Sequence, residues 1–268
     1  MTMPTSSFFC PTRIYMGSSG HRQLSGFLKE YGCRKPFIAI DNALLATDFA
    51  KSVFDLVRKE GIDVSIFTEI ESDPSVETVE KAFAKYQEQQ ATVVLAVGGE
   101  STIDVAKAVA ILSTNGGNID DYEGIERFKT PPLPLIAIPT TAGTGSEVSG
   151  SCVITDKSRG VKISIRHASL NPARIAILDP LSLQTIPSMV AFHAGVDAFV
   201  YAFESFISRN ASPMTDAINI DAIRIISANI RPFVANPANA EAALNMLCGS
   251  ALAGMTFGQT GLGNVHCM

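Results

Sequence analysis

Residues 93–112 read VVLAVGGESTIDVAKAVAIL and join an apolar run, a glycine pair and a helical segment without interruption. The run at 93–97 is continuously apolar, which predicts a strand that is buried on both faces. The segment at 103–112 is long enough and apolar enough to predict a buried helix. A strand that passes through Gly98 and Gly99 directly into a helix is typical of an α/β protein built on a parallel sheet.

The same alternation of short apolar runs and amphipathic segments begins at Pro36 and continues to Pro139. Further strands are predicted at 37–40, 64–67 and 135–138, and helices at 45–57 and 76–86. Strict alternation of strand and helix implies right-handed crossovers between parallel strands. Ligands of such sheets bind beyond the carboxyl ends of the strands, which is where the polar motifs of this chain begin.

The chain changes character after Asp179-Pro180. From 188 to 268 it has no strand-like run, only long helical stretches rich in Ala, Ile and Phe. We therefore predict two domains: an α/β domain with a Rossmann-like parallel sheet at residues 1–183, and an all-helical domain at residues 184–268. The length of 268 residues permits this, because most domains have ~100–150 residues.

The charge balance argues against a nucleic-acid-binding surface. Lys and Arg number 21 and Asp and Glu 26, for a net charge of −5, and the basic residues are scattered rather than clustered as phosphate binding requires. No apolar run reaches the ~18–20 residues of a membrane span, and the N-terminus does not resemble a secretory signal. The five cysteines have no metal-finger or redox spacing, which indicates reduced thiols. We expect a cytoplasmic protein without nucleic-acid or membrane partners.

Two polar motifs follow predicted strands. Gly98-Gly99-Glu100-Ser101 is suited to a diphosphate, because glycines allow close approach and the following helix N-terminus supplies N–H donors. The same pattern is also an ordinary turn, and the Glu100 carboxylate counts against a phosphate unless it points away. The second motif, at 140–147, reads TTAGTGSE and presents four hydroxyls and two glycines to a ligand, unless it is a simple glycine and threonine turn.

Asp41 ends the first strand of the alternating region. A carboxylate at this position accepts a hydrogen bond from a ribose 2′-hydroxyl and repels a 2′-phosphate, which favours NAD over NADP. The other interpretation is that Asp41 caps the helical segment that starts near Ala43. The two roles are compatible.

In combination these motifs resemble those of the iron-containing (group III) alcohol dehydrogenases. The resemblance rests on GGESTIDVAK at 98–107, PTTAGTGSE at 139–147, Lys162, Asp179-Pro180, GVDA at 195–198 and GLGNVH at 261–266, which occur in the family's order. It covers essentially the whole chain and implies an NAD-binding domain, a helical domain and a catalytic divalent metal between them. It places the following residues at the cofactor: Asp41, Gly98, Gly99, Ser101, Thr140, Thr141, Thr144 and Lys162.

The chain departs from the family pattern at the metal. The family's first two ligands are an aspartate and a histidine four residues later, whereas this chain has Asp197 and then Tyr201. His266 matches the third ligand, and the chain ends before the fourth, so an incomplete helical domain is expected. A phenol has an unperturbed pKa of about 10 and ligates Fe²⁺ or Zn²⁺ poorly, so a weakened or absent site is expected. His193, one turn before Asp197, is a further candidate ligand; alternatively it caps the helix or faces solvent.

The leading hypothesis is an NAD(H)-dependent, metal-assisted oxidoreductase that interconverts a small primary alcohol and its aldehyde. The alternative is a catalytically inactive cofactor-binding or interaction protein that has lost the metal site. A third hypothesis, a relative of glycerol dehydrogenase or dehydroquinate synthase, is disfavoured by the run at 140–147. Loss of later helices is expected to expose apolar surface at 220–255, which leads us to expect a homo-oligomer.

Overall fold

The computed structural model describes residues 5–266 and contains a six-stranded sheet in the order β1-β9-β6-β4-β2-β3. All neighbouring strands of this sheet run parallel. Its strands are β1 (Arg13–Met16), β2 (Pro36–Ile40), β3 (Ser65–Phe67), β4 (Val93–Gly98), β6 (Leu135–Pro139) and β9 (Ile175–Leu178). The four strands predicted from apolar runs are confirmed, and so is the parallel sheet. The two strands at the β1 edge were not predicted.

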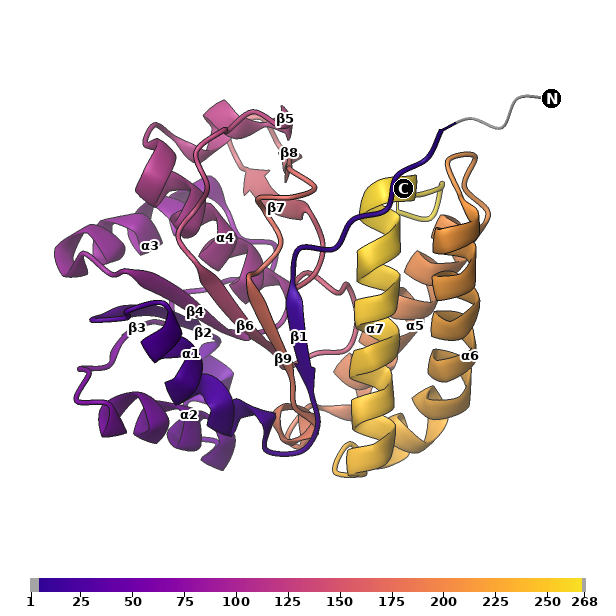
Figure 1. Cartoon of the computed structure of the whole chain (residues 1–268), viewed down its shortest axis with the longest axis horizontal. Helices are drawn as coiled ribbons and strands as arrows, with labels where there is room; N and C mark the ends of the chain where they lie inside the picture. Colours follow the sequence, from indigo (N-terminus) through magenta and orange to yellow (C-terminus); the bar gives the residue numbers. More distant parts are fainter. Residues whose placement is uncertain (1–4, 267–268) are drawn as a thin grey trace.

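Four helices cover the two faces of this sheet (Figure 1). They are α1 (Leu24–Glu30), α2 (Asp48–Lys59), α3 (Val76–Gln89) and α4 (Glu100–Asn115). Side chains of β2 alternate between the faces, so that Ile38 packs with α1 and α2 whereas Phe37 packs with α3 and α4. Thr47 and Ser75 cap α2 and α3 by accepting hydrogen bonds from backbone N–H groups. Burial on both faces explains why the central strands are uniformly apolar.

A second, three-stranded sheet packs against α3 and α4. It contains β5 (Gly124–Ile125), β7 (Ser151–Asp156) and β8 (Val161–Arg166), of which β7 and β8 form an antiparallel hairpin. Short 3₁₀ helices connect the elements: η1 (Gly20–Gln23), η2 (Asn42–Leu44), η3 (Ile119–Tyr122) and η4 (Pro180–Leu183). The hairpin was not predicted, because its strands alternate between buried and exposed residues and lack a uniformly apolar run.

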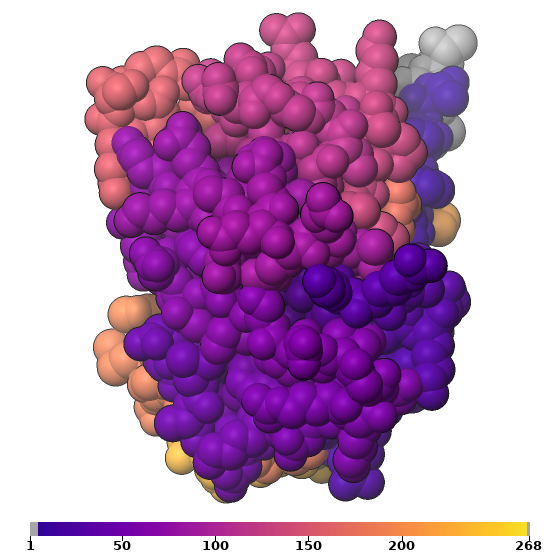
Figure 2. Space-filling model, turned by 90° about the vertical axis from the view of Figure 1, so that its left-hand side faces the viewer, coloured from indigo at the N-terminus to yellow at the C-terminus, as the bar shows by residue number. Residues whose placement is uncertain are grey.

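The C-terminal part consists of three packed helices, α5 (Ser188–Phe206), α6 (Pro213–Ala235) and α7 (Ala240–Thr260). These helices lie beside the β1–β9 edge of the large sheet (Figure 1). When the molecule is viewed from the side of the α/β part, that part covers almost all of the three helices (Figure 2). One apolar core joins the two parts, because Leu178 of β9 and Val148 of the loop between β6 and β7 pack among residues of α5, α6 and α7. The predicted α/β and all-helical fold class is confirmed.

The exposed apolar surface differs from the expectation. Of the large apolar side chains at 220–255, only Ile220 is strongly exposed, because α6 and α7 bury their apolar faces against each other and against α5. The largest group of exposed apolar side chains lies instead along α5: Met189, Val190, Phe192, Val196, Phe203 and Phe206. No helix within residues 5–266 is both long enough and apolar enough to cross a membrane. Four cysteines in this range are free thiols, and Cys267 lies outside the described residues.

Candidate functional site

A cleft of about 970 Å³ opens at the carboxyl ends of the parallel strands. From β2 the chain passes to β3 on one side, and then to β4 on the other side, so the gap between the ends of β2 and β4 is a topological switch point. Open α/β sheets bind their ligands at such points. Asp41 follows β2 and Gly99 follows β4, and both line this cleft.

Most of the residues predicted at the cofactor line this one cleft: Asp41, Gly99, Ser101, Thr140, Thr141 and Thr144. His193 and Asp197 of α5 line it as well, so it extends from the sheet to the helical part. Gly98 and Lys162 do not line it. A side chain at Gly98 would overlap the side chain of Thr102, so this glycine permits the tight turn from β4 into α4. Lys162 Nζ lies 2.5 Å from Asp73 Oδ1 in an exposed ion pair.

The position of Asp41 is compatible with both roles considered for it. Its Oδ1 accepts a hydrogen bond of 2.9 Å from the backbone N–H of Ala43 and thereby caps η2. The carboxylate also faces the cleft, and among the described residues only Oδ1 is engaged. Oδ2 therefore remains available to accept from a ribose hydroxyl.

The motif at 140–147 divides its residues between two tasks. Thr140, Thr141 and Thr144 line the cleft, whereas the two glycines contact the helical part. A Cβ atom at Gly143 would lie 3.2 Å from Cβ of Ala194, and one at Gly145 would lie 2.6 Å from the carbonyl oxygen of Ser250. The sequence suggested that both glycines allow a ligand to approach. In the structure they instead allow α5 and α7 to pack closely against this loop.

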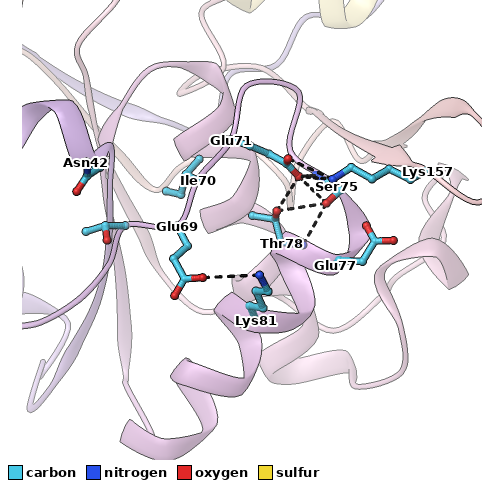
Figure 3. Close-up of a pocket in the computed structure, with 10 residues that line it drawn as sticks. Asn42, Glu69, Ile70, Glu71, Ser75, Glu77, Thr78, Lys81 and Lys157 are labelled. Atoms are coloured by element: carbon cyan, nitrogen blue, oxygen red, sulfur yellow. Dashed lines mark hydrogen bonds and ion pairs between the residues drawn. The ribbon is translucent and has the colours of Figure 1, made fainter.

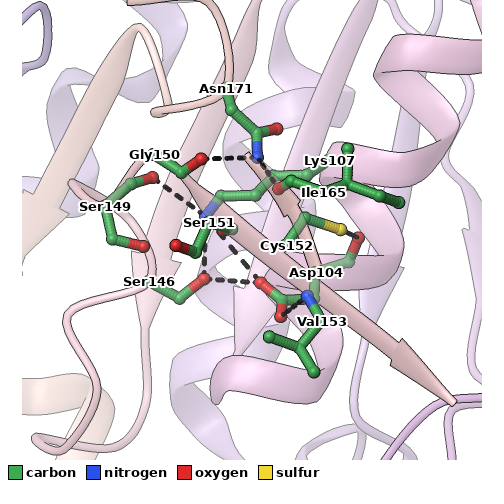
Figure 4. A network of polar contacts seen from close by, with 10 residues as sticks. All are labelled: Asp104, Lys107, Ser146, Ser149, Gly150, Ser151, Cys152, Val153, Ile165 and Asn171. Atoms are coloured by element: carbon green, nitrogen blue, oxygen red, sulfur yellow. Dashed lines mark hydrogen bonds and ion pairs between the residues drawn. The ribbon is translucent and has the colours of Figure 1, made fainter. Parts of the chain in front are cut away.

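Behind the cleft, Asp104 and Lys107 of α4 form a buried polar network with the loop before β7 (Figure 4). Lys107 Nζ donates to Ser146 Oγ at 3.0 Å and to the carbonyl oxygen of Ser151 at 2.5 Å. Ser146 donates in turn to Asp104 at 2.7 Å. Burial raises the pKa of Asp104, and the charge of Lys107 opposes that shift. Because each partner is satisfied, the network fixes α4, and with it the turn at Gly99, against β7.

The end of the cleft nearest α5 is acidic. Glu100 is the first residue of α4, and Asp197 projects from α5 into the same cleft. Burial, followed by the charges of Asp104 and Asp197, raises the pKa of Glu100 to about 8. Burial also raises the pKa of Asp197. The buried Glu147, in the adjoining loop, has a pKa raised to about 7 by its removal from water.

The residues that match the family's metal ligands lie close together but are engaged with one another. His266 Nε2 lies 3.4 Å from Asp197 Oδ1, and His266 Nδ1 lies 2.6 Å from Glu204 Oε2. Tyr201 stacks on His266 with a centroid distance of 3.9 Å, and burial raises the pKa of its phenol. No group of three His, Cys, Asp or Glu residues suited to a metal occurs within residues 5–266, so His193 does not join Asp197 and His266 in one set. This donor set does not fit a complete tetrahedral site.

A smaller hollow of about 530 Å³ adjoins the cleft beyond Glu71 and Ile70, which line both (Figure 3). Glu71 accepts hydrogen bonds from Ser75 and Lys157, which lower the pKa of its carboxyl to about 2. Glu71 was not predicted as a lining residue. It lies several residues after the end of β3, and β3 is itself short and half-buried, so the sequence did not mark this position as the end of a buried strand.

Another lining segment was missed at Ser182, Thr185 and Ile186. It follows β9, whose apolar run Ile-Ala-Ile-Leu at 175–178 ends at Asp179 in the same way that β2 ends at Asp41. That shared pattern of a short apolar run closed by an aspartate is the signal that identifies it.

The sequence matches two family models. Residues 11–180 match the model described as iron-containing alcohol dehydrogenase, and residues 191–268 match that of the C-terminal domain of the Fe-containing alcohol dehydrogenase family. The chain is 34% identical over 261 residues to the NAD-dependent methanol dehydrogenase of Bacillus methanolicus, covering 97% of this chain and 68% of that protein. Among other curated relatives the share covered is as low as 63%, so the chain spans about two thirds of their length.

Solved structures of the same fold extend this similarity. A 1,3-propanediol oxidoreductase superposes with a TM-score of 0.94 at 33% identity, covering 98% of this chain and 69% of that one. Sulfoacetaldehyde reductase from Bifidobacterium kashiwanohense in complex with NAD⁺ superposes with a TM-score of 0.91 at 27% identity, covering 98% of this chain and 70% of that one.

Proposed function

The chain belongs to the iron-containing alcohol dehydrogenase family, and from this membership we propose that it interconverts a small primary alcohol and its aldehyde with NAD(H). The observation that carries the proposal is the cleft at the switch point, which gathers six predicted cofactor residues and four residues of α5 in one space. NAD supplies a hydride acceptor when bound, and NADH a hydride donor.

We propose an orientation of the cofactor along the cleft. The adenosine ribose lies at Asp41, and the diphosphate lies against Gly99 and Ser101, where the first turn of α4 offers unpaired N–H groups. The nicotinamide then lies at the α5 end, beside Thr144 and Asp197.

The substrate is expected at the α5 end too. This end is lined by the apolar side chains of Val190, Ala194 and Ile186 and by the polar side chains of His193 and Asp197. Such a mixture of apolar and polar side chains suits a short carbon chain with one polar group. Relatives are named for methanol, 1,3-propanediol and sulfoacetaldehyde, and the proposal for this chain is limited to a small alcohol or aldehyde.

The family is expected to use a divalent metal, Fe²⁺ or Zn²⁺, and Asp197 and His266 are the residues of this chain proposed as its ligands. We assign no step of the reaction to the metal, because the described donors fall short of a set of three. The exposed apolar side chains of α5 support the further proposal that the chain forms a homo-oligomer. Sedimentation analysis of the purified chain tests it.

Two measurements on the purified chain test the proposed function. Binding of NADH is followed by its fluorescence, and turnover by loss of NADH absorbance with short aldehydes, in the presence of Fe²⁺ or Zn²⁺. Saturable binding with turnover that Asp197→Ala abolishes supports the dehydrogenase. Binding without turnover supports the alternative, a cofactor-binding or interaction protein that lacks the metal-assisted reaction. Absence of NADH binding refutes the dehydrogenase and the cofactor-binding protein, and leaves only the interaction protein.

A further inference from the structure

Three of the four histidines of this chain have ring nitrogens that are engaged by other groups. His21 Nδ1 lies 2.6 Å from a buried carboxylate, His167 Nδ1 accepts from backbone N–H groups of its own loop, and His266 lies between two carboxylates. The fourth is His193, whose ring nitrogens make no hydrogen bond or ion pair in the described part of the chain. Its ring lies 5.8 Å from that of Phe192, centroid to centroid. An imidazole without a partner on the wall of a cleft is available to a ligand.

His193 lies on the side of α5 that borders the cleft. Val190, His193, Ala194 and Asp197 all line the cleft, and their spacing of three and four residues places them on one side of the helix. The loop after β6 comes close to the same side, because a Cβ atom at Gly143 would lie 3.2 Å from Cβ of Ala194. His193 therefore lies where the helical part meets the loop that carries the threonines of the cleft.

Reduction of an aldehyde needs a proton as well as a hydride. When the hydride reaches the carbonyl carbon, negative charge develops on the oxygen, which must receive a proton to give the alcohol. The described lining of the cleft contains no Lys or Arg, and its serine and threonine hydroxyls donate hydrogen bonds but keep their protons at neutral pH. Asp197 lines the same end, but an ionised carboxylate repels a developing oxyanion, whereas a protonated imidazole attracts it. Histidine is also the side chain that most often transfers protons in enzymes.

We propose that His193 is a catalytic residue that exchanges a proton with the oxygen of the substrate. In reduction, the nicotinamide ring of NADH gives a hydride to the carbonyl carbon, the π electrons of the C=O bond move to the oxygen, and the protonated imidazole gives its N–H proton to that oxygen. The products are the alcohol, NAD⁺ and a neutral imidazole. The imidazole then takes a proton from solvent, to which this side chain is exposed. Oxidation of the alcohol reverses each step. This inference rests on the proposed function, which places the nicotinamide and the substrate at the α5 end of the cleft.

The test measures reduction of propanal by the full chain, followed by loss of NADH absorbance, and binding of NADH, followed by its fluorescence. His193→Gln keeps a polar side chain of similar size and removes the group that exchanges the proton. We expect its kcat to fall by about 10²–10⁴-fold and its affinity for NADH to change by less than about twofold. His193→Ala leaves space for a small base, so we expect added imidazole to restore part of its turnover. Circular dichroism checks that both variants fold.

Val196→Ala is the matched control, because Val196 lies on the same helix and is exposed but does not line the cleft. It is expected to leave kcat and the affinity for NADH unchanged. Wild-type turnover in His193→Gln overturns the inference and leaves the proposed function standing. Loss of turnover in Glu100→Gln but not in His193→Gln assigns the proton to the carboxyl group and overturns the inference too. A wild-type chain that binds NADH without turnover overturns the dehydrogenase and the inference together.

His193 is also a candidate metal ligand, and calorimetry with Zn²⁺ alone separates the two roles. A proton donor that does not hold the metal is expected to leave the Zn²⁺ affinity of the chain unchanged when it is replaced. A His193→Gln protein that loses affinity for Zn²⁺ in parallel with its turnover, and a His193→Ala protein that imidazole does not restore, would assign the side chain to the metal and overturn the inference.

Discussion

Replacement of Gly145 by alanine places a methyl group 2.6 Å from the carbonyl oxygen of Ser250 and 2.8 Å from Cα of Gly254. Both neighbours are backbone atoms of α7, so they cannot rotate away. The φ angle of Gly145 is +63°, which costs a residue with a Cβ atom about 1–2 kcal/mol. Overpacking adds about 1–3 kcal/mol. We therefore expect Gly145→Ala to lower the free energy of unfolding by about 2–5 kcal/mol.

Gly160→Ala is the matched control. Gly160 has nearly the same φ angle, +65°, in the turn between β7 and β8, but an added Cβ meets no atom within 4 Å there. It should therefore cost only the backbone contribution of about 1–2 kcal/mol. In thermal unfolding followed by circular dichroism, about 1 kcal/mol corresponds to about 2–4 °C for a chain of this size. The melting temperature of Gly145→Ala is expected to fall by several degrees more than that of Gly160→Ala.

A third variant separates packing from backbone conformation. Gly254 lies inside α7, where alanine ordinarily stabilises a helix by about 1 kcal/mol. A Cβ there would lie 2.7 Å from the carbonyl oxygen of Gly145, so Gly254→Ala should nevertheless destabilise the protein. Equal melting temperatures for Gly145→Ala and Gly160→Ala would refute the reasoning. So would a Gly145→Ala protein of wild-type stability that no longer binds NADH, because the glycine would then serve the cofactor.

Three further predictions concern single side chains. Tyr201→His places an imidazole beside His266 and one turn from Asp197. We expect this substitution to raise the affinity for Zn²⁺, measured by calorimetry, at least about tenfold. The control Tyr122→His places its imidazole far from these residues and should give no gain. Asp41→Asn removes the charge expected to repel a 2′-phosphate, so the ratio of NADH to NADPH affinity should fall; an unchanged ratio would show that Asp41 does not select the cofactor. Burial raises the pKa of Glu147 from 4.5 to about 7. Ionisation of this carboxyl therefore favours the unfolded chain, and the free energy of unfolding falls as the pH rises from about 4.5 to about 7. Glu147→Gln should therefore raise the melting temperature at pH 8 and leave it nearly unchanged at pH 4, and a gain at both pH values would contradict the assigned cause.

The central fold could be predicted from the sequence because its strands are buried on both faces. Such strands are uniformly apolar, as β2 and β4 are, and the helices α2 and α3 begin at capping residues. The hairpin of β7 and β8 gave no comparable signal, since its pattern of buried and exposed residues matches one covered face only. β1 was missed for a related reason: as an edge strand of four residues it is only half-buried.

The site could be predicted in part for the same physical reason. Asp41, Gly99 and Thr140 follow buried strands directly, so the strand predictions located them. The sequence could not show that Gly143 and Gly145 serve helix packing, because the contacting residues, Ala194 and Ser250, lie far along the chain. Nor could it show that Glu204 would occupy Nδ1 of His266, which depends on how the C-terminal turn folds back on α5.

The position of β1 has a consequence for synthesis on the ribosome. The register partner of Arg13 is Ile175, about 160 residues later, so β1 can pair only after β9 has been made. At ~5–20 residues per second, that interval is roughly 10–30 s. During it the rest of the sheet can assemble from β2 onward, since β2, β3 and β4 pair with near neighbours in the chain. β1 would then close a finished edge, and the nascent chain would spend that interval with β1 free for chaperones to bind.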